Sequence, residues 1–200
     1  MNPLDGKDNK IAGFIFKAQV LQENINKQLT PPMQSSELSL ESISKKVSLD
    51  FLDKDLVDNS RKMSAVYIAI SAFENMLRKI ISEMLLSQKG ENWWSSDSIS
   101  NDIRKRAETK QADEKQNRWH NPRGLNPIYF TELKDLVSII CNEKNWTFFV
   151  DLCGDPDWVR HSVKSLERSR NVIMHSGQLT LEDIERVGIT IRDWIRQIGN

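Results

Sequence analysis

The sequence predicts an all-α fold, and three observations favour it. Among 200 residues there are only 8 glycines and 6 prolines, so few residues interrupt regular structure. Apolar residues recur at the three- and four-residue spacing of helices, and strand-like alternation is scarce. Hydrophobic residues make up 38% of the chain, which is sufficient for the core of one folded domain of this length. We therefore expect a helical bundle.

Charge and cysteine content exclude several classes of protein. Lys+Arg and Asp+Glu both number 28, so the chain is not a broadly basic protein that coats nucleic acid. Cys141 and Cys153 belong to no CxxC or Cys/His cluster, so we expect neither a structural zinc site nor another cofactor. The apolar run at residues 11–16 is too short for a signal peptide or a membrane helix. A soluble protein of the reducing cytoplasm is expected.

The chain divides at about residue 57. A first helix is predicted from Asn9 to about Leu29, where Pro31 follows and prevents its continuation. Many serines and little periodicity mark residues 31–57 as a linker, with a short helix around residues 40–47. Residues 1–57 are thus predicted to be an N-terminal helix and linker, and residues 58–200 a helical domain.

The middle of the chain holds one long helix and one highly charged segment. The long helix is predicted from Asp58 or Ser60 to Ser87, with Gly90 beyond its end. Trp93 and Trp94 are expected to be a hydrophobic anchor of the loop or a dimer contact, rather than a platform for bases. Residues 98–118 carry many charges and almost no apolar face, which indicates either a solvated helix or a mobile excursion.

Four more helices are predicted towards the C-terminus. They cover residues 130–141, residues 144–152, a stretch from Asp155-Pro156-Asp157 to His175, and residues from Thr180 to Ile198. Acidic residues and proline in the first turn favour the start at Asp155, and Thr180 is a typical N-cap.

Two ionisable residues lie within apolar helix faces. At about 100° per residue, Arg170 falls within about 20° of Val159, in the middle of an apolar stripe. Glu74 falls about 20° from Met63 in the stripe of the long helix. Because burying a lone charge is costly, we predict that Glu74 and Arg170 meet. The alternative is that each side chain extends to solvent or to a partner subunit.

The stretch ERSRNVIMHSGQL contains Arg170 and His175 separated by four residues, followed by a glycine. It resembles the R-x4-H motif of the HEPN superfamily, small α-helical domains found in many ribonucleases and toxins. The stretch YFTEL from Tyr129 and the stretch AFENMLR around Glu74 are similar to one HEPN branch. The resemblance covers about residues 60–198 and implies a HEPN-like helical bundle with an extra N-terminal helix and linker.

The resemblance implies a metal-independent endoribonuclease that cleaves RNA through the ribose 2′-hydroxyl, as a homodimer whose two motifs share a cleft. His175 would act as general base or acid, because histidine side chains titrate near neutral pH. Arg170 would bind phosphate oxygens, and Glu74 would orient it. Asn171 would orient His175 or donate to phosphate. A toxin or anti-phage defence role is implied, with an antitoxin or a defence-system protein as a candidate partner.

A loop upstream offers a second set of RNA-binding candidates. They are Arg118, Trp119, His120 and Arg123, in which basic side chains flank an aromatic one. The alternative is an ordinary polar surface loop.

Two other functions are consistent with the same residues. The chain could be a catalytically silent HEPN module for dimerisation, RNA binding or partner binding. It could also be a structural bundle in which the spacing of Arg170 and His175 is accidental.

Overall fold

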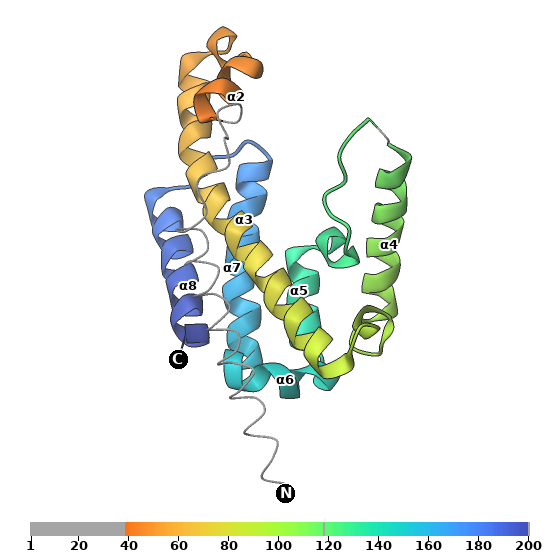
Figure 1. Ribbon diagram of the computed structural model, residues 1–200. Helices are drawn as coiled ribbons and strands as arrows, with labels where there is room; N and C mark the ends of the chain where they lie inside the picture. The colour runs from red at the N-terminus through yellow and green to blue at the C-terminus, as the bar shows by residue number, and fades with distance from the viewer. Residues whose placement is uncertain (1–38, 118, 200) are drawn as a thin grey trace, which may run out of the picture. The chain divides into compact units, whose positions relative to one another are not determined.

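The computed structural model describes residues 39–117 and 119–199, and all regular structure within them is helical (Figure 1). The predicted all-α class is confirmed for this part of the chain. The predicted first helix, from Asn9 to about Leu29, lies outside the described residues. The chain forms two compact units, of which the first ends at Ser64 and the second runs from Ala65 to Ile198.

The first unit begins with two short helices. α2 (Leu40–Lys46) is capped by Ser39, whose Oγ accepts the N–H of Ser42 at 3.1 Å. η1 (Leu49–Phe51) is a single 3-10 turn that follows it. The short helix predicted within the serine-rich linker is therefore confirmed.

α3 (Lys54–Lys89) is the longest helix and belongs to both units. It begins earlier than the start at Asp58 or Ser60 that the sequence predicts. The cause is a cap, because the Asp53 carboxylate accepts the N–H of Leu56 at 3.1 Å.

Within the second unit, α3 contributes an apolar stripe to the core. Its side chains recur at three- and four-residue spacing and are almost fully buried: Ile70, Phe73, Leu77, Ile81 and Leu85. The ring of Phe73 meets the indole of Trp194 edge to face, with 5.4 Å between centroids. This contact holds α3 against α8 (Leu181–Gly199).

The charged segment forms a regular helix. η2 (Trp93–Ser95) comes first, with both tryptophans buried as predicted. α4 (Asn101–Gln116) follows, and Ser100 caps it. The guanidinium of Arg104 donates to three carbonyls of the preceding loop, those of Trp94, Ser96 and Ile99. The arginine therefore fixes the loop to α4 and excludes the mobile alternative.

The helix predicted from Phe130 is divided in two. η3 (Pro127–Phe130) and α5 (Leu133–Ile140) are separated by Thr131 and Glu132, which are extended. The Glu132 N–H donates to the Asp135 carboxylate at 3.0 Å, so it starts a new helix instead of continuing the old one. The prediction of one continuous helix here was wrong.

The last three helices begin where the sequence indicates. They are α6 (Glu143–Cys153), α7 (Pro156–Met174) and α8. The Asp155 carboxylate accepts two backbone N–H groups of the first turn of α7, at 3.2 and 3.1 Å. The Thr180 hydroxyl accepts one from the first turn of α8, at 3.2 Å. The predicted helix start at Asp155 and the predicted cap at Thr180 are both confirmed.

A tight turn joins α7 to α8. The N–H of Ser176 donates to the carbonyl of Ile173, and the N–H of Gly177 to that of Val172, at 3.0 and 2.8 Å. These two bonds form a Schellman motif. A Cβ at residue 177 would lie 2.7 Å from Val172 Cγ1. Glycine therefore allows the chain to leave the helix immediately after His175.

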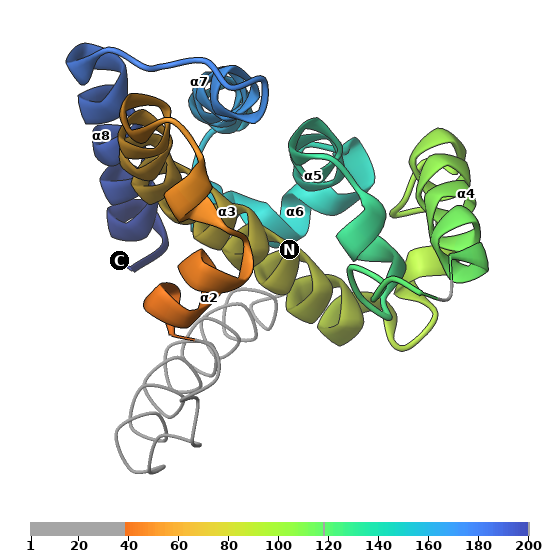
Figure 2. The same cartoon turned by 90° about the horizontal axis from the view of Figure 1, so that it is seen from above.

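Aromatic contacts join α7 and α8 in the second unit. The rings of Trp158 and Trp194 are 4.7 Å apart, and the Trp194 N–H donates to the Ser162 hydroxyl at 2.8 Å. Figures 1 and 2 both show α3, α7 and α8 side by side, with α5 next to α7. α4 packs on η3. The three helices that carry Glu74, Arg170 and Trp194 therefore share one core.

None of the described helices is long and apolar enough to cross a membrane. Cys141 and Cys153 are free thiols, and burial raises the pKa of Cys153 to about 12. Cys153 is therefore an un-ionised thiol that packs in the core.

Candidate functional site

Glu74 lies in the core of the second unit, and only 8% of its side chain is exposed. Its Oε2 lies 3.5 Å from the Nε of Arg170 on α7. The pairing predicted from the two helical wheels is therefore confirmed. A buried carboxylate next to a guanidinium satisfies the requirement that buried charges be paired.

The guanidinium of Arg170 contacts Glu74 through its Nε, and part of the side chain is exposed to solvent. The residue occupies the same face of α7 as Val163 and Leu166, which are fully buried. Nevertheless 34% of its side chain is exposed. A guanidinium offers five N–H donors in a fixed plane, so the group can contact Glu74 and still donate to an anion in solvent.

Sequence analysis missed a second arginine at this carboxylate. Arg78 forms an ion pair with the other oxygen of Glu74, and only 11% of its side chain is exposed. It also donates to the carbonyls of Ile128, at 3.3 Å, and Thr131, at 3.1 Å. The signal was the four-residue spacing of Glu74 and Arg78, which places them on one helix face.

Glu74 therefore joins three elements. Arg78 ties the carboxylate to the segment around η3, and Arg170 ties it to α7. The predicted orienting role of Glu74 is consistent with this geometry, but the same carboxylate also has a structural role.

His175 and Asn171 lie at the exposed end of α7. His175 is the C-cap, and its N–H donates to the Asn171 carbonyl at 3.1 Å. Both side chains are exposed. Among the described residues, no hydrogen bond joins the Asn171 amide to the imidazole. The four-residue spacing predicts that the two side chains share one face of the helix. Because the Asn171 amide does not bond to the imidazole, it can donate to another group.

Arg170 and His175 point in different directions. Five residues at 100° each place them about 140° apart around the helix. Arg170 faces Glu74 in the core, whereas His175 faces solvent. Within the described part of this chain no hydrogen bond or ion pair joins them. A single copy of the chain therefore presents the two groups on different faces of one helix end.

The loop between α4 and η3 contributes less than the sequence predicts. Arg123 forms an ion pair with Glu114 of α4 through its Nε, at 2.6 Å, and its guanidinium lies over the ring of Phe130. Arg123 therefore fixes the loop to α4, and its guanidinium is less available to bind RNA. Trp119 and His120 are exposed and contact each other, with 5.9 Å between ring centroids. Arg118 lies outside the described residues.

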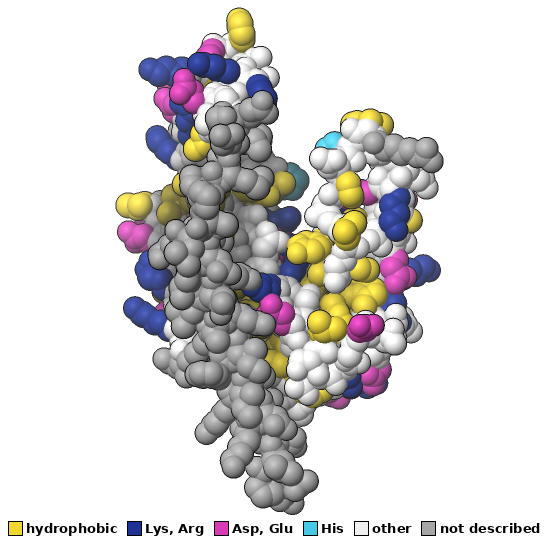
Figure 3. All heavy atoms as spheres, viewed as in Figure 1, with side chains coloured by type: hydrophobic (Ala, Val, Ile, Leu, Met, Phe, Trp, Pro, Cys, Tyr) yellow, Lys and Arg dark blue, Asp and Glu magenta, His cyan; other side chains and the backbone are white. Residues whose placement is uncertain are grey.

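Hydrophobic side chains gather on the surface over this loop and η3 (Figure 3). The most exposed of them are Trp119 and Leu125, at 84% and 91%. Trp119 and His120 are thus the two described candidates from this loop that remain open to a ligand.

Basic residues of α4 are mostly used in structural contacts. Arg106 pairs with Asp135 at 2.6 Å, and Lys110 pairs with Glu132 at 2.8 Å. The hydrogen bond from Lys110, together with one from Lys134, lowers the pKa of Glu132 from 4.5 to about 2. These contacts fix α4 to α5, so Arg106 and Lys110 are not free to bind phosphate.

The described residues contain no cluster of three or more His, Cys, Asp or Glu side chains that could hold a metal ion. The chemistry that the site itself offers is that of an exposed imidazole, an amide and a half-exposed guanidinium.

Comparisons with protein-family models, with curated proteins and with solved structures find no significant match. The resemblance to HEPN domains therefore depends on the sequence motifs quoted above alone.

Proposed function

We propose that this chain is a HEPN-type endoribonuclease that cleaves RNA without a metal ion, at a site formed by Arg170, Asn171 and His175. Glu74 acts as a positioning residue for Arg170. The observation that carries the proposal is the ion pair between Glu74 and Arg170. A purely structural arginine would be covered, whereas Arg170 contacts Glu74 through its Nε and about one-third of its side chain is left exposed.

In the proposed reaction the imidazole of His175 accepts the proton of a ribose 2′-hydroxyl. The 2′-oxygen forms a bond to the adjacent phosphorus, and the bond from phosphorus to the 5′-oxygen breaks. The leaving oxygen takes a proton from His175 of the partner subunit. The products carry a 2′,3′-cyclic phosphate and a 5′-hydroxyl, and the need for a 2′-hydroxyl makes the enzyme specific for RNA.

Arg170 stabilises the charge that develops on the phosphate oxygens. A guanidinium binds two such oxygens at once and stays charged at any pH at which proteins fold. Because Glu74 already fixes its base, little reorganisation is needed when the phosphate arrives. Asn171 is a second donor to the phosphate from the preceding turn of α7.

A homodimer completes the proposed site. One chain supplies one motif histidine, and its Arg170 and His175 face different sides of α7. Exposed apolar side chains lie beside the motif, with Val172 at 39% and Met174 at 54% exposure. Such side chains favour association of two α7 ends, which would place two histidines at one phosphate.

The test is cleavage of a mixed RNA pool by wild type, Arg170→Ala and His175→Ala, with Arg196→Ala as a control from the exposed face of α8. Both motif variants should lose activity by at least about 100-fold, as is typical of a lost acid–base or oxyanion-stabilising group. The control should cleave at the wild-type rate, and circular dichroism should show that all variants are folded.

Full activity in both motif variants would exclude this site. Tight RNA retention without turnover in the wild type would instead identify a binding module. The proposed setting is a toxin or anti-phage defence system, in which an antitoxin or another defence protein restrains the activity.

A further inference from the structure

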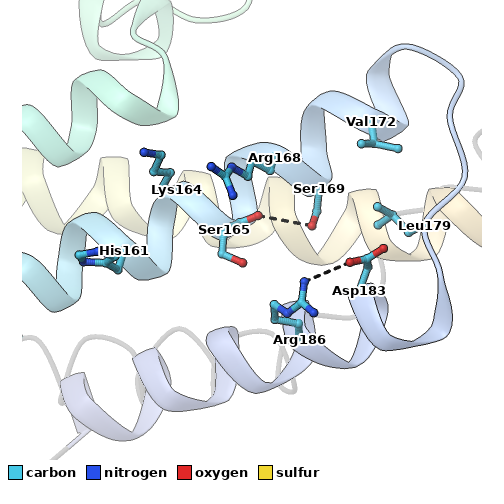
Figure 4. Close-up of a pocket in the computed structure, with 9 residues that line it drawn as sticks. All are labelled: His161, Lys164, Ser165, Arg168, Ser169, Val172, Leu179, Asp183 and Arg186. Carbon is cyan, nitrogen blue, oxygen red and sulfur yellow. Dashed lines mark hydrogen bonds and ion pairs between the residues drawn. The ribbon is translucent and has the colours of Figure 1, made fainter.

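A groove runs between α7 and the N-terminal half of α8, on the side of α7 away from Glu74. Its volume is about 520 Å³ (Figure 4). α7 contributes the side chains of Lys164, Ser165 and Arg168, which follow one another along the helix in Figure 4. None of the residues assigned to the reaction lines this groove.

Two of the cations in the groove are uncompensated. Lys164 and Arg168 are exposed, and neither has an ion-pair partner among the residues that the structure describes. The carboxylate of Asp183 also lines the groove, but it pairs with Arg186 at 3.1 Å and accepts the Thr180 hydroxyl at 2.8 Å. The groove therefore presents a net positive charge.

Three cations of α4 show how a surface cation is neutralised by structural contacts. Arg104, Arg106 and Lys110 all contact carbonyls or carboxylates of neighbouring elements. Lys164 and Arg168 make no such contacts among the described residues. Lys105 and Lys115 of α4 make none either, but only Lys164 and Arg168 lie together in a groove. Their charge is available to a ligand.

A neutral donor accompanies these cations. The Ser165 hydroxyl lies in the same groove, whereas the Ser169 hydroxyl donates to the Ser165 carbonyl at 3.4 Å. His161 lies at the far end of the groove, and its Nδ1–H donates to the Asp157 carbonyl at 2.8 Å, so Nε2 of the neutral ring is an acceptor and not a donor to phosphate. Lys, Arg and Ser side chains are the groups that most often contact phosphate oxygens of nucleic acids.

One end of the groove reaches the proposed catalytic turn. Val172 and Leu179 line it, and they flank the turn of residues 173–178 that carries His175. The axial distance from Lys164 to His175 is about 16 Å at 1.5 Å per residue. A few nucleotides of a single strand cover such a distance.

We infer that this groove binds the backbone phosphates of single-stranded RNA and directs the strand to His175. The inference deepens the proposed function and rests on it. Lys164 and Arg168 neutralise two consecutive phosphates, and the Ser165 hydroxyl donates to the same strand. The contacts are with phosphate, so the groove has no preference for base sequence.

The test measures RNA binding separately from cleavage. All proteins carry His175→Ala, so that a fluorescein-labelled 20-nucleotide single-stranded RNA stays intact. Anisotropy gives the Kd between 50 and 300 mM salt for this parent and for the parent with Lys164→Ala/Arg168→Ala. The matched control is Lys105→Ala/Lys115→Ala, which removes the same charge from exposed positions on α4.

For single strands each phosphate contact contributes about 0.7 to the slope of log Kd against log salt. Loss of two contacts should lower the slope by about 1.4 and raise the Kd about 25-fold at 0.1 M salt. The α4 control should change the slope and the Kd much less.

Three results would overturn the inference. They are no RNA binding by the parent, an equal loss in the α4 control, and poly-glutamate binding that is as tight as RNA binding and depends equally on Lys164 and Arg168. Each leaves the cleavage test of Arg170 and His175 unaffected, so failure of the groove and failure of the proposed function are distinguishable.

Discussion

Glu74 is the residue at which folding and the proposed chemistry meet. One carboxylate, almost fully buried, contacts Arg78 with one oxygen and Arg170 with the other. Removing one member of a buried ion pair leaves the remaining charge uncompensated. Arg78 is the more buried of the two arginines. If Glu74 is removed, the uncompensated charge of Arg78 should therefore account for most of the lost stability.

Glu74→Ala should therefore lower the free energy of unfolding by about 3–5 kcal/mol, and the folded fraction should cleave RNA more slowly. Urea denaturation measures the first effect. A rate per folded molecule measures the second. The control is Glu185→Ala on the exposed face of α8, which should change stability by less than about 0.5 kcal/mol. Equal stability of Glu74→Ala and wild type would contradict the structural role.

Single residues explain where the sequence was sufficient and where it was not. Asp155 and Thr180 cap helices through bonds to their own first turns, so short-range chemistry predicts them. The pairing of Glu74 and Arg170 followed from two helical wheels, because each charge occupied an apolar face. The contacts of Arg78 with carbonyls 50 and 53 residues away have no local signal.

At the scale of elements, charge decides how α4 and α5 are joined. A charge-rich sequence with little apolar face was ambiguous between a helix and a mobile segment. The structure resolves it, because Ile103 and Ala107 are buried and basic side chains bind neighbouring elements. The break between η3 and α5 was missed because the apolar periodicity continues across it. The Asp135 carboxylate accepts the Glu132 N–H, and this local cap starts a new helix.

Glu132 makes this junction sensitive to acid. Bonds from Lys110 and Lys134 lower its pKa to about 2. Its stabilising contribution is therefore complete above the ordinary pKa of 4.5 and is lost as the pH falls towards 2. Its side chain is 45% exposed, so solvent screening limits the effect to about 1 kcal/mol or less.

Urea unfolding at pH 6 and pH 3 tests this dependence. Wild type should lose more stability over this interval than Glu132→Gln, so the gap between the two proteins should be smaller at pH 3 than at pH 6. Glu185→Gln serves as the control and should follow wild type at both pH values. A gap between wild type and Glu132→Gln that stays constant with pH would contradict the ionic origin.

At the scale of the whole molecule, the proposed site requires two copies of the chain. Met174→Asp places a charge among the exposed apolar side chains beside the motif, so the dimer should dissociate and RNA cleavage should fall with it. Sedimentation velocity and cleavage would be measured at the same protein concentration. Ile195→Asp is the matched control, since Ile195 is similarly exposed, at 56%, near the other end of α8.

A wild-type protein that cleaves RNA as a monomer would contradict the requirement for a dimer. Loss of the dimer in the Ile195 variant alone would place the contact at a different surface.

The central claim is that His175 cleaves RNA through the 2′-hydroxyl without a metal ion. The most direct measurement incubates wild type and His175→Ala with RNA in EDTA and analyses the ends of the products. Wild type should give fragments with 2′,3′-cyclic phosphate ends, and the variant should leave the RNA intact. Cleavage that EDTA abolishes, fragments with 3′-hydroxyl ends, or equal cleavage by both proteins would contradict it.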